Sequence, residues 1–235
     1  EVHLGLCEVE AISINKSFIH RNQTGQSYGV LKWAMSLDGR IGLPNGKSKW
    51  ISNELSRSKV HNLRAEFDAI VIGGNTLRND DPLLTTRDIK NPEPLRVVFT
   101  KSLKLPSKRT LWDCKVAKSL IVYDGSIADE KYLAELPKCV ETAKLDSSDP
   151  KLLSKLLAER GLNKVLWECG PNLATSALKN GCIQEIITFI APKILGGTSS
   201  MTPLGELSFK DMNEVYDFNG GKIKLLNGDI FIRNN

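Results

Sequence analysis

Residues 69–76 read Ala69-Ile70-Val71-Ile72-Gly73-Gly74-Asn75-Thr76, a run of four apolar residues followed by two glycines. A short apolar run that is rich in β-branched residues and closed by glycine is typical of a fully buried strand. Such strands occur mainly in parallel sheets that helices cover on both faces. This segment therefore predicts an α/β domain built on a mostly parallel sheet.

Strand-like and helix-like segments alternate along the rest of the domain. Strands are expected at residues 30–34, 95–99, 120–123, 164–167 and 184–190, and helices at 52–66, 150–160 and 171–179. Ser52 is the expected N-cap of the first helix, and Gly161 is the expected stop of the second. Residues 222–233 have the pattern of an antiparallel hairpin that turns at Asn227-Gly228. Together they predict an open sheet with crossover helices.

The first 27 residues are expected to form a separate unit. Apolar residues spaced among acids, Asn and Ser over residues 6–18 predict a short amphipathic helix, and the polar stretch 21–27 predicts a linker. The domain proper is expected to occupy residues 28–235. The chain begins Glu-Val-His without a signal-peptide pattern, so we expect it to be a piece of a longer polypeptide whose targeting information lies upstream.

Composition and charge narrow the class of protein. The net charge is +5, but Lys and Arg are scattered among acids, which favours phosphates on a small molecule over a nucleic-acid partner. Every apolar run is far shorter than the ~20 residues of a membrane-spanning helix, so we expect a soluble protein without a membrane partner. The five cysteines are widely spaced and the three histidines are isolated. Neither a disulfide framework nor a metal site is expected, and we expect a reducing compartment.

Three expected strand ends finish in small residues, at 73–76, 168–171 and 195–198. In an open α/β sheet, ligands bind beyond the carboxyl ends of the strands, where glycine lets a phosphate approach exposed backbone amides. Gly170-Pro171, before the helix at 171–179, is the best candidate for a phosphate cradle. A plain turn explains any one glycine pair equally simply. Neither GxGxxG nor GxxxxGK[ST] is present, so an ordinary Rossmann domain and a P-loop are not supported.

Three other segments carry side chains suited to a ligand. The loop 37–52 is long enough to be functional, and its Trp50 either stacks on a planar ring or plugs the core. Residues 79–87 place Asp80, Asp81 and Arg87 where they can read a pyrimidine edge and a phosphate, or form a surface salt bridge. Glu168 ends an apolar strand, where a carboxylate is costly to bury without a partner. Glu168 is therefore the strongest single candidate.

Taken in order, these segments resemble one family, the reductase domain of the bifunctional riboflavin-biosynthesis deaminase-reductase. The resemblance rests on residues 31–41 (LKWAMSLDGRI), 48–52 (SKWIS), 63–70 (LRAEFDAI), 79–87 (NDDPLLTTR), 168–174 (ECGPNLA) and 190–197 (IAPKILGG). The run WECGP at 167–171 is similar to plant and cyanobacterial members. Residues 1–27 look like the closing helix and linker of the family's preceding deaminase domain, whose zinc-binding HxE and PCxxC elements are absent here.

The resemblance implies a dihydrofolate-reductase-like fold, NADPH as cofactor, and reduction of the ribose of 5-amino-6-(5-phosphoribosylamino)uracil to the ribityl chain of 5-amino-6-(5-phosphoribitylamino)uracil. It implies Lys32 and Glu168 as the catalytic pair and no metal. The implied substrate contacts are Ser48, Ser52, Arg64, Leu84 and Arg87. The implied cofactor contacts are Ala34, Trp50, Gly73, Gly74, Thr76, Asp80, Gly170, Pro171, Asn172, Leu173, Ala174, Thr175 and Ser176. Lys101 stands where the family often has a serine at the cofactor, which leaves its role open.

Two other functions stay open on the sequence. A pterin reductase of the dihydrofolate-reductase type would use the same fold and cofactor, although a phosphate clamp at Arg87 argues against it. A catalytically inactive nucleotide-binding or scaffold remnant of a fusion protein is the alternative outside enzymes. The joint presence of Lys32, Asp80, Arg87 and Glu168 disfavours it. The resemblance also suggests a homodimer, located in the plastid stroma if the source is a plant and in the cytoplasm otherwise.

Overall fold

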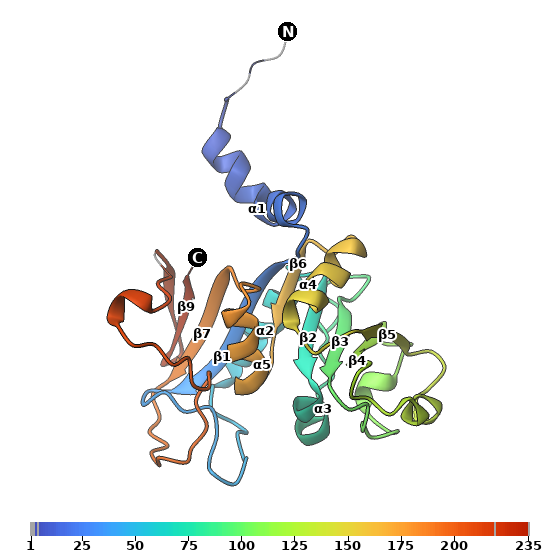
Figure 1. Ribbon diagram of the computed structural model, residues 1–235. Coiled ribbons are helices and arrows are strands. Elements are labelled where there is room, and N and C mark those ends of the chain that lie inside the picture. Colours follow the sequence, from blue (N-terminus) through green and yellow to red (C-terminus); the bar gives the residue numbers. More distant parts are fainter. Residues whose placement is uncertain (1–2, 4, 219, 235) are drawn as a thin grey trace.

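The protein folds around one sheet in a computed structural model that describes residues 3, 5–218 and 220–234. Within them, nine strands lie in the order β5-β4-β3-β2-β6-β1-β7-β9-β8 (Figure 1). The parallel strands are β1 (Tyr28–Ser36), β2 (Ala69–Gly73), β3 (Leu95–Thr100), β4 (Ser119–Asp124), β5 (Glu141–Leu145), β6 (Lys164–Trp167) and β7 (Glu185–Ala191). β8 (Lys222–Leu226) and β9 (Asp229–Asn234) form an antiparallel hairpin, and β9 pairs with β7. The predicted mostly parallel sheet with an antiparallel C-terminal hairpin is confirmed.

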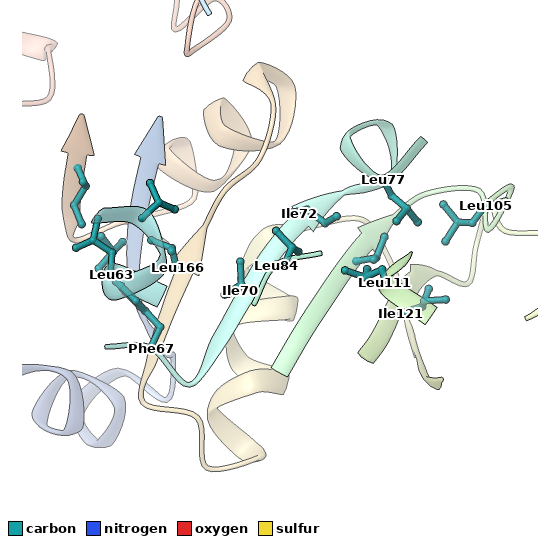
Figure 2. Close-up of a cluster of buried hydrophobic side chains, with 14 of the residues drawn as sticks. Leu63, Phe67, Ile70, Ile72, Leu77, Leu84, Leu105, Leu111, Ile121 and Leu166 are labelled. Carbon is teal, nitrogen blue, oxygen red and sulfur yellow. The ribbon is translucent and has the colours of Figure 1, made fainter. Parts of the chain in front are cut away.

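Helices cover both faces of the sheet. α4 (Pro150–Glu159) and α5 (Pro171–Lys179) lie on one face, and α2 (Glu54–Arg64) lies on the other (Figure 1). α2 and α3 (Gly74–Asp80) contribute Leu63 and Leu77 to a buried cluster that also holds Phe67 and Leu84 (Figure 2). A second cluster packs α4 and α5 against the opposite face of the same strands. The central strands are covered on both sides, which is why most of their residues are apolar.

Local signals in the sequence placed most of these elements correctly. The bounds of β6 and α5 match the expected ones, and α4 ends just before Gly161, which adopts a positive φ of 83°. The hairpin turns at Asn227 and Gly228, which both have positive φ values, as predicted. The expected cap of α2 is wrong, because the side chain of Asn53 and not that of Ser52 accepts a hydrogen bond from the amide of Ser56.

The N-terminal helix differs from its prediction in length and in contacts. α1 spans Glu8–Thr24, so most of the expected linker is helical, and the helix ends at Gly25 with φ 69°. Its N-terminal apolar side chains do not face a core, since Val9 and Ile14 are 78% and 81% exposed. The helix extends from the sheet edge at which the parallel strands begin (Figure 1). Lys16 anchors it through a 2.8 Å ion pair with the buried Glu185.

Cys114 and Cys139 form a disulfide, which corrects the expectation that no cysteines pair. The two residues lie 25 positions apart, in the loop after the 3₁₀ turn Thr110–Trp112 and in the loop before β5. They meet because β4 and β5 are neighbours in the sheet. Spacing along the chain alone does not reveal such a pair.

Neither a membrane-spanning helix nor a metal-binding cluster is found among the residues that the structure describes. None of the helices is both long enough and apolar enough to cross a lipid bilayer. No group of three or more His, Cys, Asp or Glu side chains is arranged to hold a metal ion.

Candidate active site

The candidate site lies at the carboxyl ends of β6 and β2, beside the middle of β1. β6 pairs with β1 through Leu31 and Trp167, so the next residues, Lys32 and Glu168, emerge side by side. The amide of Glu168 continues the ladder by donating to the carbonyl of Val71 at 2.9 Å. From the central strands β2, β6 and β1, the sheet extends to β5 on one side and to β8 on the other. Such a topological switch point is where open α/β sheets bind ligands.

Three expected site residues meet there. The Nζ of Lys32 lies 3.6 Å from Oε2 of Glu168. Arg64, the last residue of α2, donates from Nε to Oε1 at 2.7 Å and from Nη2 to Oε2 at 3.2 Å. The three side chains are only 11–15% exposed. Two cations therefore hold a carboxylate at the end of an apolar strand. Their attraction offsets the free-energy cost of removing this carboxylate from water.

The charges in this cluster divide the roles of Lys32 and Glu168. Burial alone would raise the pKa of Glu168, but the charge of Arg64 and then that of Lys32 outweigh it and hold this pKa at about 2. Burial lowers the pKa of Lys32, against the attraction of Glu168 and with the help of the charge on Arg64. Glu168 is therefore held in its anionic form, whereas Lys32 gives up its proton more readily than an exposed lysine does.

A second arm of the site is the segment 84–88. The carbonyl of Thr85 accepts from Nη1 of Arg64 at 3.1 Å, and Nδ1 of His61 lies 3.0 Å from the same oxygen. Leu84 is 2% exposed, so it can offer a ligand only its main chain. Arg87 is exposed, and among the described residues it forms no ion pair. The structure thus ties the base of this segment to the Glu168 cluster and leaves the guanidinium of Arg87 available.

The start of α5 forms an open cradle beside β2. Gly170 is the N-cap of α5 and no side chain caps the helix, so the amides of its first turn are available. A Cβ at Gly170 would meet nothing within 4 Å, whereas one at Gly73 would lie 3.7 Å from the side chain of Leu173. Within the expected cofactor segment, Ala174 is 1% exposed, and Thr175 accepts from the amide of Gly205 at 2.7 Å. Those two side chains are therefore used by the fold.

The loop before α2 reaches over the same edge of the sheet. Trp50 is 63% exposed, which excludes a role in plugging the core. The guanidinium of Arg57 lies 4.5 Å from the centroid of its ring. Ser48 and Ser52 are half-buried in this loop, and Nζ of Lys49 reaches the carbonyl of Asp80 at 3.5 Å. The loop is thereby joined to the end of α3.

The remaining expected residues lie farther out along the site. Ala34 and Thr76 are half-buried, Asp80 is exposed at the end of α3, and Lys101 is exposed just after β3. Gly74 packs against Thr100, because a Cβ there would lie 2.9 Å from Oγ1. Asn172 is exposed and Ser176 half-buried on α5. No hydrogen bond or ion pair within the described part of the chain joins Thr76, Asp80 or Arg87 to the Lys32–Glu168–Arg64 cluster.

The third glycine-rich strand end does not expose its amides as expected. The carboxylate of Asp38 accepts from the amides of Leu195 and Gly196 at 3.1 and 2.7 Å, and from the hydroxyl of Ser36 at 2.5 Å. These hydrogen bonds, that of Ser36 first, lower the pKa of Asp38 to about 2. The amides at 195–196 are thus occupied by the protein's own carboxylate, which fastens the loop after β7 to the end of β1.

Reasoning from the sequence missed His61, which it treated as an isolated histidine. His61 lies three residues before Arg64 on α2, and side chains at this spacing share one face of a helix. That spacing was the available signal. The spacing does not reveal that His61 and Arg64 both contact the carbonyl of Thr85, because Thr85 is distant from both of them in the sequence.

Two known proteins align with most of the length of this chain. It is 40% identical over 216 residues to "Riboflavin biosynthesis protein RibD" of Synechocystis sp., covering 92% of this chain and 58% of that protein. It is 39% identical over 204 residues to "Riboflavin biosynthesis protein PYRR, chloroplastic" of Arabidopsis thaliana, covering 86% of this chain and 34% of that protein. The chain thus spans between a third and three fifths of these relatives.

A solved structure shares the fold. The Thermotoga maritima protein described as a diaminohydroxyphosphoribosylaminopyrimidine deaminase/5-amino-6-(5-phosphoribosylamino)uracil reductase superposes with a TM-score of 0.83 at 25% identity, covering 98% of this chain and 62% of that one. The family model described as "RibD C-terminal domain" matches residues 27–221. This match includes the β1, β6 and α2 residues of the Glu168 cluster. The chain therefore belongs to the RibD C-terminal domain family.

Proposed function

We propose that this chain is an NADPH-dependent reductase of riboflavin biosynthesis. Its substrate is 5-amino-6-(5-phosphoribosylamino)uracil, and its product is 5-amino-6-(5-phosphoribitylamino)uracil. The observation that carries the proposal is the Lys32–Glu168–Arg64 cluster, buried at the switch point of the sheet beside the open start of α5. The Thermotoga maritima relative, described as a 5-amino-6-(5-phosphoribosylamino)uracil reductase, supports the choice of substrate.

Reduction of the ribose requires its ring to open, so that the former anomeric carbon becomes an imine carbon. Bound NADPH would supply the hydride for that carbon. The ring oxygen takes up a proton as its bond to the anomeric carbon breaks, and Lys32 is the group in the cluster that can supply it. Glu168, ionised and held by Arg64, keeps Lys32 in place and stabilises positive charge on the imine nitrogen.

The substrate phosphate is assigned to Arg87. Its guanidinium is exposed and unpaired among the described residues, on the segment whose base Arg64 holds through the Thr85 carbonyl. Arginine grips phosphate oxygens with a rigid fork of donors. Ser48 and Ser52, from the loop before α2, and the main chain of Leu84 complete the proposed substrate contacts. A pterin carries no phosphate, so this assignment favours a phosphorylated substrate over a pterin.

NADPH is assigned to the edge formed by α5, the end of β2 and the loop before α2. The open position at Gly170 and the uncapped amides of the first turn of α5 fit a pyrophosphate. The proposed cofactor residues are Ala34, Trp50, Gly73, Gly74, Thr76, Asp80 and Gly170 to Ser176. Ala174 and Thr175 would act through their main chain, since the fold uses their side chains.

Organisation, assembly and location are part of the same proposal. Residues 28–235 form the reductase domain, and residues 1–27 join it to an upstream domain. The protein acts as a homodimer, without nucleic-acid or membrane partners. It works in the plastid stroma if its source is a plant, as the chloroplastic name of the Arabidopsis relative suggests, and in the cytoplasm otherwise.

An absorbance assay of NADPH oxidation tests the proposal. The protein is given NADPH with either the deaminated phosphoribosylamino-pyrimidine or dihydrofolate. Consumption of NADPH with the phosphoribosylamino-pyrimidine alone is expected. Consumption with dihydrofolate alone would establish a pterin reductase, and consumption with neither would indicate an inactive remnant; either result overturns the proposal.

A further inference from the structure

We propose that His61 is a substrate-specificity residue that binds the phosphate of the substrate together with Arg87. The inference deepens the proposed function and rests on it. It assigns to His61 a role that follows from the geometry around the Thr85 carbonyl.

The hydrogen bond to Thr85 fixes the orientation of the His61 ring. A carbonyl oxygen can only accept, so the Nδ1 that lies 3.0 Å from it carries the proton. Nε2 is then the nitrogen left for a ligand, and no described residue forms a hydrogen bond with it. A nitrogen fixed in this way becomes a donor when the ring is protonated.

The segment that carries the Thr85 carbonyl is buried and hydrogen-bonded. Leu84, Thr85 and Thr86 are 2%, 5% and 0% exposed. Glu93 accepts from the amide and hydroxyl of Thr86 at 2.7 and 2.8 Å, and Leu84 packs in the same buried cluster as Leu63 of α2 (Figure 2). His61 and the segment that bears Arg87 are therefore held in a fixed relation.

Two arginines and one carboxylate act electrostatically on His61. Arg64 lies one turn along α2, Arg87 two residues beyond Thr85, and the nearby carboxylate of Glu168 is already bound by Arg64 and Lys32. Burial lowers the pKa of His61, and the charges of Arg64 and Arg87 lower it further, against the hydrogen bond to Thr85 and the charge of Glu168. A phosphate monoester, with close to two negative charges at neutral pH, adds negative charge to this group.

Two substitutions separate binding by His61 from support of the segment. His61→Asn places an amide nitrogen near the position of Nδ1 and removes Nε2, whereas His61→Leu removes both nitrogens. His20→Asn is the matched control, because His20 is a partly buried histidine that packs against Tyr28 at the opposite edge of the sheet. The measurements are the KM for the phosphorylated substrate, kcat, and the competitive inhibition constant of inorganic phosphate.

Both His61 variants are expected to raise the KM and the inhibition constant of phosphate by the same factor, about 10-fold, the size of one lost charge-assisted hydrogen bond. kcat is expected to stay within about 2-fold for His61→Asn, since Lys32 and Glu168 are untouched. His20→Asn is expected to leave all three values unchanged. An unchanged inhibition constant for phosphate in both His61 variants would overturn the inference.

A titration of the wild-type protein distinguishes failure of this inference from failure of the proposed function. The imidazole signals of His61 are followed by NMR against pH, with and without inorganic phosphate. Binding is expected to raise the pKa of His61 because a nearby anion favours the charged ring. An unchanged pKa at saturating phosphate would contradict a role in phosphate binding, even in a protein that reduces the substrate. A raised pKa in a protein that does not oxidise NADPH would instead refute only the proposed reaction.

Discussion

Arg64 holds Glu168 in a two-pronged contact, with Nε 2.7 Å from Oε1 and Nη2 3.2 Å from Oε2. Its third nitrogen, Nη1, donates to the carbonyl of Thr85 at 3.1 Å. One guanidinium therefore fixes both the carboxylate at the end of β6 and the base of the segment 84–88. Lys32, 3.6 Å from the same carboxylate, completes the cluster. Because Arg64 has this double role, one side chain positions both the proposed catalytic pair and the proposed phosphate site.

Replacing Glu168 by Gln should lower kcat by about 10²–10³-fold, the usual contribution of a buried group that stabilises charge in the transition state. Gln keeps the shape but removes the anion that two buried cations share, so the melting temperature should also fall.

Glu185→Gln provides the control for that loss of stability. Glu185 is fully buried and pairs with Lys16 and Arg233, but it lies at the start of β7, at the edge of the sheet away from the site. The Glu185→Gln variant should have a lower melting temperature than the wild type and a kcat near the wild-type value. Equal loss of kcat in both variants would show that the effect of Glu168 is structural.

The pH profile of kcat should report Lys32. Burial lowers the pKa of its ammonium, and the proposed proton donor is the charged form. Activity should therefore be constant below this pKa and fall as pH rises through it, at a pH below the ordinary lysine value of 10.5. Lys32→Arg should remove this basic limb, because a guanidinium stays protonated throughout. A basic limb of unchanged midpoint in the arginine variant would assign the titration to another group.

Much of the fold was predictable because its signals are local. The four-residue apolar run closed by glycine at 69–73 marks β2, and Gly161 and Asn227-Gly228 mark a helix end and a turn. β5 was missed because this edge strand, Glu141–Leu145, has no apolar run. The Cys114–Cys139 pair was missed because it depends on which strands become neighbours.

The site was predictable only in part, for a similar reason. Glu168 stood out as a carboxylate after an apolar strand, and the family resemblance supplied Lys32 and Arg64. The hydrogen bonds of Asp38 to 195–196 and of His61 to Thr85 join segments far apart in sequence. Such contacts depend on register and on helix placement, which local patterns do not specify.

Asp38→Asn should weaken the protein mainly above pH 4. The folded-state pKa of Asp38 is about 2, below its ordinary value of 3.8, so its contribution is complete above the ordinary value and is lost as pH falls through the folded one. The variant should be less stable than the wild type at neutral pH, and the difference should vanish near pH 2, as measured by denaturant unfolding at several pH values. A difference that stays constant down to pH 2 would show that the ionised carboxylate does not bind the loop.

Removing the disulfide should cost stability without loss of catalysis. A crosslink that closes a 25-residue interval contributes about 3.5 kcal/mol by the loop-entropy estimate. Cys114→Ser should lower the melting temperature. A thiol reductant added to the wild type should lower it by the same number of degrees as this substitution. Cys7→Ser, at an exposed free cysteine, is the control and should change nothing. A reductant that leaves the melting temperature unchanged would show that the crosslink contributes no stability.

We propose that hydride reaches the former anomeric carbon of the substrate beside the Lys32–Glu168–Arg64 cluster. The most direct measurement uses NADPH deuterated at its transferable position, with the protein and 5-amino-6-(5-phosphoribosylamino)uracil, and locates the label in the product by NMR. The account predicts one deuterium on the ribityl carbon bonded to the exocyclic nitrogen, and negligible labelled product from Glu168→Gln over the same time. Label at any other position, or labelled product formed equally fast by the variant, would contradict it.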